Sequence, residues 1–282
     1  MFLIVIHLMV GLFQTWRLRS RPADLAQVRQ AWYARALAIA GVHVTWHDIG
    51  SLPNGEVGSA TSAETDAAIE GALSTGDGDS GLGDDDRTDS GQLLVSNHVS
   101  WLDIPILGMR FDPAFVAKAE IAKWPLIGWM SRYQRVLFLQ RGAHQASAMA
   151  DVLQAVILGR DDGLSRQAAI FPEATTSNGL QVFSFHARLF APVIVTGAPV
   201  QPVAIGYRLE PGEAFSAAAF VDEVPLTKSL WTVLTRKQTH VGVYVLPRIT
   251  PPYTSRDELA RKAEKAIANA LNVPVIRRTR RA

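Results

Sequence analysis

The stretch LLVSNHVSWLDIPIL, from Leu93 to Leu107, places a histidine and an aspartate between two apolar runs. The first run predicts a buried strand, and Pro105 belongs in the first turn of a helix, because proline has no N–H to donate there. The helix therefore begins near Asp103, which leaves His98 on the strand-to-helix loop, where α/β folds place their chemistry. A histidine on such a loop can fold back onto the carboxylate, which fixes its tautomer and leaves the other ring nitrogen as a general base.

The spacing of His98 and Asp103 is weak evidence by itself, because His43 and Asp48 repeat it in VHVTWHDI, residues 42–49. That segment alternates like a strand, so two residues at odd spacing point to opposite faces of the sheet. We interpret the earlier pair as structural. For the later pair two interpretations stay open on this segment alone: a catalytic dyad, or an aspartate that caps the helix beside a turn histidine.

Beyond residue 92, strand-like apolar runs alternate with helical patterns. This alternation predicts an α/β domain with a mixed, largely parallel central sheet flanked by helices. The expected strands are 93–96, 115–118, 136–139, 168–171, 200–207 and 240–246, and the expected helices are 104–110, 122–132, 143–158, 187–195, 226–235 and 255–271.

Composition limits the classes of protein that remain. The chain has 282 residues, of which 48% are hydrophobic, and no cysteine, which excludes disulfides, thiolate metal ligands and a cysteine nucleophile. The net charge is only +2, yet residues 51–90 hold ten acids against one base, so the remainder carries about +11. A basic body favours anionic partners such as phosphate-bearing substrates and lipid headgroups. Nucleic acid fits less well, because the positive charge gathers at the termini without interleaved aromatic residues.

The first 13 residues, MFLIVIHLMVGLF, form an apolar run that arginines follow at positions 17, 19 and 21. This order reverses that of a signal peptide, and the run is shorter than the roughly 20 residues that span a bilayer. We expect an interfacial or half-inserted helix at the cytoplasmic face of the membrane, with an ordinary buried helix as the alternative. A second helix, 23–40, has an apolar stripe with Arg29 and Arg35 off it. Together, residues 1–41 would form a two-helix membrane-associating hairpin.

Residues 51–90 are rich in Gly, Ser, Asp and Ala and show no sustained periodicity. Such a segment buries too little apolar surface to offset the entropy lost on ordering it. We interpret it as a disordered acidic insertion in one α/β domain that spans residues 42–282.

Two further segments run from a predicted strand into polar residues. RVLFLQRG ends with Arg141 beside a glycine, and AAIFPEATTSNG leads from a buried strand into Pro172, Glu173 and a hydroxyl-rich turn. An arginine at a strand end suits an anion clamp, although taken alone a surface salt bridge is the simpler explanation. No Gly-x-Ser-x-Gly elbow, Walker loop, His-Glu-x-x-His or Gly-x-Gly-x-x-Gly motif offers a competing mechanism.

Five segments together resemble a known family. NHVSWLD, FVAKAEIAKWPLIGW, VLFLQR, FPEATTS and APVQPVAI follow the order and approximate spacing of the four motif blocks of the glycerolipid acyltransferases. The chain resembles in particular the bacterial 1-acylglycerol-3-phosphate (lysophosphatidic acid) acyltransferases, from about Gln92 to Tyr207, and its two N-terminal helices are similar to that family's. Several ordered motifs are far harder to obtain by chance than one spacing.

The resemblance implies a mechanism and a role for each block. His98 would deprotonate the acceptor hydroxyl and Asp103 would orient it. The hydroxyl would then attack an acyl thioester, carried by coenzyme A or acyl-carrier protein, with no acyl-enzyme, metal or other cofactor. The implied substrate-binding residues are Arg141 for the acceptor phosphate, Glu173 and Thr175 for the acceptor site, Pro202 for the acyl side, and Lys118 as a basic position before WPLIGW, a run that is either core or membrane-dipping surface.

The sequence departs from the family pattern at the acceptor side. The third block usually reads Phe-Pro-Glu-Gly-Thr-Arg-Ser, whereas here Ala174 replaces glycine and Thr176 replaces arginine. Ala174 matters only if its φ is positive, and Thr176 weakens the case for a phosphate-rich acceptor. In the second block Gln140 stands where aspartate is common, and Arg135 where glycine is common.

The expected function is acylation of a lyso-glycerolipid hydroxyl at the membrane surface. Lysophosphatidic acid, giving phosphatidic acid, is the first expected acceptor. A lyso-ornithine lipid or another lysophospholipid is the alternative. A non-catalytic membrane-binding relative is the second class of function considered.

Overall fold

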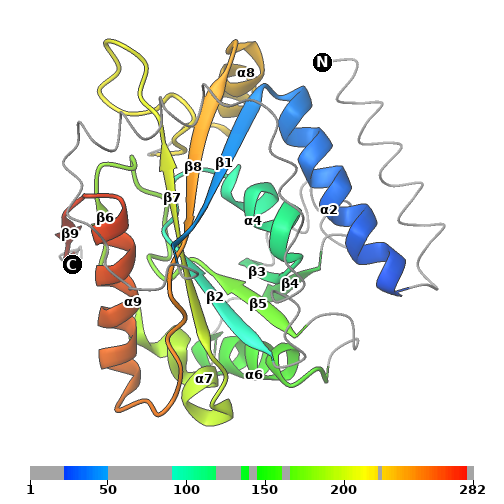
Figure 1. Cartoon of the computed structure of the whole chain (residues 1–282), viewed down its shortest axis with the longest axis vertical. Helices are drawn as coiled ribbons and strands as arrows, with labels where there is room; N and C mark the ends of the chain where they lie inside the picture. Colours follow the sequence, from blue (N-terminus) through cyan, green and yellow to red (C-terminus); the bar gives the residue numbers. More distant parts are fainter. Residues whose placement is uncertain are drawn as a thin grey trace.

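The computed structural model describes residues 22–49, 91–118, 135–139, 145–160, 166–221 and 224–277 (Figure 1). Within these ranges a seven-stranded sheet has the order β1-β8-β7-β2-β5-β3-β4, and β6 pairs with β9 in a second, small sheet. The strands are β1 Val42–Asp48, β2 Gln92–Ser96, β3 Ala114–Lys118, β4 Val136–Leu139, β5 Gln167–Ile170, β6 Val182–Phe183, β7 Val200–Tyr207, β8 Thr239–Val245 and β9 Val275–Ile276. The helices are α2 Pro22–Ile39, α4 Asp103–Phe111, α6 Gln145–Ile157, the 3₁₀ turn η4 Ala187–Phe190, α7 Ala191–Thr196, α8 Leu226–Thr235 and α9 Arg256–Ala270.

The direction of the strands determines at which end of the sheet the candidate site residues can lie together. β7, β2, β5, β3 and β4 run parallel to one another, whereas β8 pairs antiparallel with β7 and parallel with β1. The prediction of a mixed, largely parallel sheet is therefore confirmed. The carboxyl ends of five strands share one edge, and three strand spacings place the end of β4 about 14 Å from that of β2.

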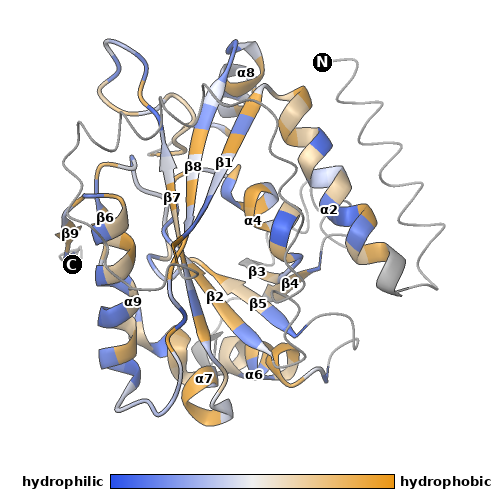
Figure 2. Cartoon of the chain, in the orientation of Figure 1, coloured by the Kyte–Doolittle hydropathy of each residue, from blue (hydrophilic) through white to orange (hydrophobic). Residues whose placement is uncertain are grey.

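The two faces of the central strand β2 pack into separate cores. Leu93 and Val95 belong to a cluster with residues of α6, α7 and α9, whereas Leu94 belongs to one with residues of α4 and α2. Successive side chains of a strand point to opposite faces, so a strand that is apolar throughout needs a helical layer on each side. Figure 2 shows this pattern, with hydrophobic central strands between the layers.

Helix α2 packs against α4 at close range. A Cβ on Gly108 would lie 2.3 Å from the Tyr33 ring, so the contact requires glycine there. The expectation that Arg29 lies off the buried stripe is wrong: it is 3% exposed, and its guanidinium donates to both Asp112 oxygens at 2.6 and 2.7 Å. The charge is buried because this bidentate partner compensates it.

Several expected elements differ in detail from the structure. The region expected as one helix over 187–195 is the 3₁₀ turn η4 followed by α7. The last helix follows Ser255, whose Oγ accepts the Glu258 N–H at 3.2 Å, as the predicted serine cap requires. Helix 122–132, the insertion 51–90 and the helix before α2 lie outside the described residues. The two-helix hairpin therefore stays a prediction. Among the described helices, none is long and apolar enough to cross a bilayer.

Candidate active site

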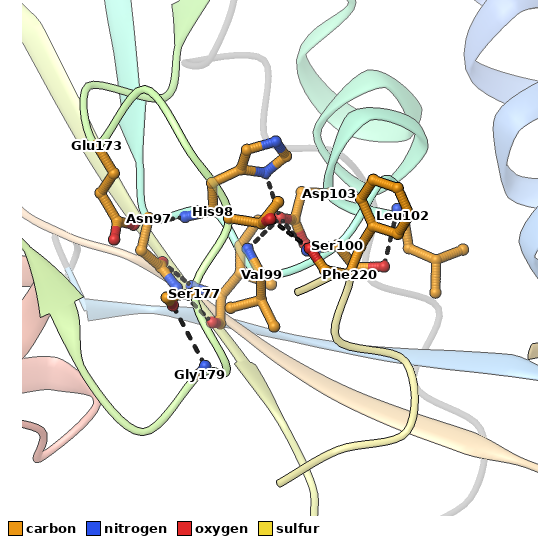
Figure 3. Close-up of polar contacts among 12 residues, drawn as sticks. Asn97, His98, Val99, Ser100, Leu102, Asp103, Glu173, Ser177, Gly179 and Phe220 are labelled. Carbon is orange, nitrogen blue, oxygen red and sulfur yellow. Dashed lines mark hydrogen bonds and ion pairs between the residues drawn. The ribbon is translucent and has the colours of Figure 1, made fainter. Parts of the chain in front are cut away.

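His98 and Asp103 meet on the loop that joins β2 to α4 (Figure 3). The His98 Nδ1 atom lies 2.8 Å from Asp103 Oδ2, and the Asp103 side chain is fully buried. The same oxygen accepts the backbone N–H groups of Val99 at 2.8 Å and Ser100 at 2.9 Å. The carboxylate therefore folds the loop back onto the histidine and makes no cap on the helix itself, since α4 has no side-chain cap. This geometry removes the alternative in which Asp103 is a helix cap alone.

The orientation of the His98 ring follows from these contacts. An ionised carboxylate only accepts, so Nδ1 carries the proton and Nε2 has a lone pair. The ring also stacks on Phe171 with its centroid 4.0 Å away and the planes 14° apart. Its side chain is 19% exposed, and in Figure 3 the second nitrogen points away from Asp103. The pair can thus accept a proton at Nε2 from a group that approaches the sheet edge.

Glu173 holds the backbone of the same histidine. One oxygen accepts the His98 N–H at 2.7 Å, and the other accepts the Phe183 N–H at 2.8 Å. The side chain is fully buried, and this burial raises the pKa of Glu173 to about 7. The Ser177 N–H donates to the His98 carbonyl at 2.7 Å, so the turn after β5 holds both the backbone N–H and the carbonyl of His98. Glu173 here acts on the histidine loop rather than presenting a free carboxylate.

Two positions where glycine is usual have positive φ in this chain. Ala174 has φ +57° and Arg135 has φ +52°. Ala174 is exposed on the turn after Glu173, and the buried Arg135 donates to the Asp112 carbonyl at 3.3 Å. A residue with a Cβ pays about 1 kcal/mol or more in this left-handed region. Both positions thus adopt a conformation that favours glycine, although neither residue is glycine.

Comparison with known proteins identifies the motif set. Residues 83–206 match the acyltransferase family. A lyso-ornithine lipid O-acyltransferase of Pseudomonas aeruginosa is 39% identical over 179 residues, which are 64% of this chain and 67% of that protein. The chain belongs to the glycerolipid acyltransferase family. A 1-acyl-sn-glycerol-3-phosphate acyltransferase of Neisseria gonorrhoeae is 34% identical over 55% of this chain and 58% of its own length.

A solved acyltransferase has the same fold. The crystal structure of the 1-acyl-sn-glycerophosphate acyltransferase PlsC from Thermotoga maritima aligns with a TM-score of 0.58. The alignment covers 96% of this chain and 94% of that one, at 18% sequence identity.

The structure describes some of the other motif residues of this acyltransferase. Pro202 is buried in β7 opposite Val95 of β2, and Lys118 is the last residue of β3, two strands from β2. Thr175 is half-buried on the Glu173 turn. Arg141 lies outside the described residues, and the strand before it, β4, ends at the same edge of the sheet as β2. Within the described ranges no cluster of three His, Asp or Glu side chains could hold a metal ion.

Several contacts that bind distant segments to the histidine loop were not predicted from the sequence. The Thr176 hydroxyl donates to the Phe220 carbonyl, and the Phe220 N–H donates to the Val99 carbonyl at 2.8 Å. The Asn97 amide donates to the Ile205 carbonyl at 2.9 Å and accepts the Ile205 N–H at 2.8 Å. The only sequence signal was the place of Asn97 beside His98. The partners lie 44 to 121 residues away, beyond any local pattern.

Proposed function

We propose that the chain transfers a fatty acyl group from an acyl thioester to the free hydroxyl of a lyso-lipid, at the membrane surface. The observation that carries this proposal is the His98 Nδ1 to Asp103 Oδ2 contact of 2.8 Å at the carboxyl end of β2. A buried carboxylate and a partly exposed imidazole are the pair that general-base catalysis requires. The donor is acyl-CoA or acyl-carrier protein.

The reaction needs one proton to move twice. The acceptor hydroxyl gives its proton to His98 Nε2 while its oxygen attacks the thioester carbonyl. The resulting imidazolium is stabilised by the Asp103 carboxylate. Collapse of the tetrahedral intermediate breaks the C–S bond, forms the ester, and returns the proton to the leaving thiolate. No covalent acyl-enzyme is involved.

For the acceptor we place a lyso-ornithine lipid first and 1-acylglycerol-3-phosphate second. Thr176 supports this order, because a hydroxyl that donates to the Phe220 carbonyl brings no positive charge to the position where the family carries arginine. The Pseudomonas relative at 39% identity is a lyso-ornithine lipid O-acyltransferase. The Neisseria relatives at 34% and the expected clamp at Arg141 favour the phosphate-bearing acceptor.

The membrane proposal rests on the N-terminal sequence. The apolar run of residues 1–13 and the arginines that follow suit insertion into one leaflet at the cytoplasmic face. A lipid acceptor would then reach the site without leaving the bilayer surface. No nucleic-acid partner is proposed.

An acceptor panel tests the proposal. The full chain is incubated with one labelled acyl-CoA, or the matched acyl-carrier protein, and separately with lyso-ornithine lipid, lysophosphatidic acid and lysophosphatidylethanolamine. We expect a labelled diacyl product with the highest kcat/KM for lyso-ornithine lipid. A higher kcat/KM for lysophosphatidic acid would reverse the acceptor order. Absence of product from every pair, by folded protein, would favour the non-catalytic membrane-binding relative.

A further inference from the structure

Tyr207 contacts the Asp103 oxygen that the histidine does not use. Its phenol donates to Asp103 Oδ1 at 2.6 Å from the end of β7, 104 residues along the chain. Oδ2 already accepts His98 and two backbone N–H groups. With Tyr207 in place, both oxygens of a fully buried carboxylate have donors.

The fold places the Tyr207 side chain beside the pair of His98 and Asp103. Asn97, next to His98, bonds both the N–H and the carbonyl of Ile205, which fixes β7 against the histidine loop. Tyr207 lies two residues beyond Ile205 and therefore on the same face of the strand, the face that packs on α4. Tyr207 is also paired with Val241 of β8, which holds its backbone from that side of β7.

The phenol donates to Asp103, and its oxygen is also bonded by the Ser100 side chain. Burial and the neighbouring Asp103 carboxylate raise the pKa of Tyr207 well above its ordinary value, so it stays protonated. Among the described residues, Glu173 is a further titratable group at this loop, and it bonds the His98 backbone rather than its ring.

We propose that Tyr207 is a positioning residue of the dyad: by holding Asp103 Oδ1 it keeps Oδ2 aligned with His98 Nδ1 and moderates the basicity of the carboxylate. The catalytic part of this inference rests on the proposed function. Without the phenol, Oδ1 is a buried acceptor with no donor, and the carboxylate can rotate away from the imidazole. The carboxylate also loses a partner that stabilises its charge, so the pair holds a proton more tightly.

The test compares Tyr207→Phe with Tyr253→Phe in the full chain. The control also removes a phenol, which donates to the Ala198 and Ile249 carbonyls at 2.7 and 3.0 Å and packs against the other core cluster. For Tyr207→Phe we expect kcat to fall about tenfold with KM within about twofold, and the acidic limb of the kcat/KM profile to move up by roughly 0.5 pH unit. The control Tyr253→Phe should keep the kcat and the acidic limb of the unmodified chain. Equal kcat and equal acidic limbs in the two variants would overturn the proposal.

A second readout needs no substrate. The downfield proton resonance of His98 Nδ1–H, assigned by its absence from His98→Ala, should shift or broaden in Tyr207→Phe and stay in place in Tyr253→Phe. This readout does not depend on finding an acyl acceptor. A resonance unchanged in Tyr207→Phe would overturn the proposal, and a shifted or broadened one would support it. If Tyr207→Phe does not fold, 3-fluorotyrosine incorporated into Tyr253→Phe serves instead. The more acidic phenol is a stronger donor, so the resonance must move for the proposal to stand.

Discussion

Replacing Glu173 with glutamine tests how the histidine loop is held. The two carboxylate oxygens accept one backbone N–H each, from His98 at 2.7 Å and Phe183 at 2.8 Å. Glutamine has the same shape but one acceptor oxygen, and its NH₂ group would face the second N–H donor. The substitution therefore breaks one of two bonds inside a fully buried site and leaves a donor unsatisfied.

The expected loss is about 2 kcal/mol, because a buried polar group left without its partner costs roughly 1–3 kcal/mol. For a chain of this size that corresponds to a fall in Tm of about 4–8 °C. The matched control is Glu264→Gln. A Glu264 oxygen accepts the Phe185 N–H at 2.6 Å, and glutamine can supply that single acceptor. We expect the control to change stability by less than about 0.5 kcal/mol.

The stability lost in Glu173→Gln should depend on pH in a direction that follows from the pKa of Glu173. Burial raises the pKa of Glu173 from 4.5 to about 7 in the native state, so the native state binds the proton more tightly than the unfolded chain. The stability that this residue contributes is full below pH 4.5 and is lost as the pH rises through about 7. Because glutamine does not titrate, the loss caused by Glu173→Gln should be larger at pH 5 than at pH 8.

Urea unfolding followed by tryptophan fluorescence at both pH values measures this difference, and acyl transfer assayed in parallel should fall as the His98 backbone loosens. A loss of stability in Glu173→Gln no larger than in Glu264→Gln, or one that grows from pH 5 to pH 8, would show that Glu173 does not hold the loop in this way.

Three further changes test other parts of the structure. Ala174→Gly should raise stability by about 0.5–1 kcal/mol in thermal unfolding, since φ is +57° and the side chain is exposed; a loss would show that the methyl group packs. Deleting residues 53–89 should leave kcat/KM within about twofold, because the composition of this segment predicts a disordered insertion; a large loss would assign it a function. Removing residues 1–20 should increase the fraction that stays in the supernatant after ultracentrifugation of membranes, and an unchanged fraction would contradict the interfacial helix.

Apolar periodicity predicted those helices and strands that depend mainly on residues close together in the sequence. The bounds of β4, β7 and α8 are those expected from apolar periodicity. The contact of His98 with Asp103 was also predictable, because it spans five residues and depends on where Pro105 allows α4 to begin. The catalytic role of the pair stays a prediction.

The remaining features depend on distant partners. Arg29 was expected outside the buried stripe because its partner, Asp112, lies 83 residues away and sits in a left-handed conformation at the end of α4. Tyr207 looked like the end of an apolar strand, and only the register of β7 against β2 brings its phenol to Asp103. Such contacts follow from topology, which periodicity does not encode.

The central claim is that His98 is the general base for acyl transfer. It is tested by assaying His98→Ala and His43→Ala with labelled acyl-CoA and the best acceptor of the panel. His43 begins the second His-x-x-x-x-Asp sequence, and its exposed side chain in β1 stacks on His240. We expect His98→Ala to lower kcat by about 10²–10⁴-fold with membrane binding intact, and His43→Ala to stay within about twofold of the unmodified enzyme. Turnover by His98→Ala above about one tenth of the rate of the unmodified enzyme would show that His98 is not the general base.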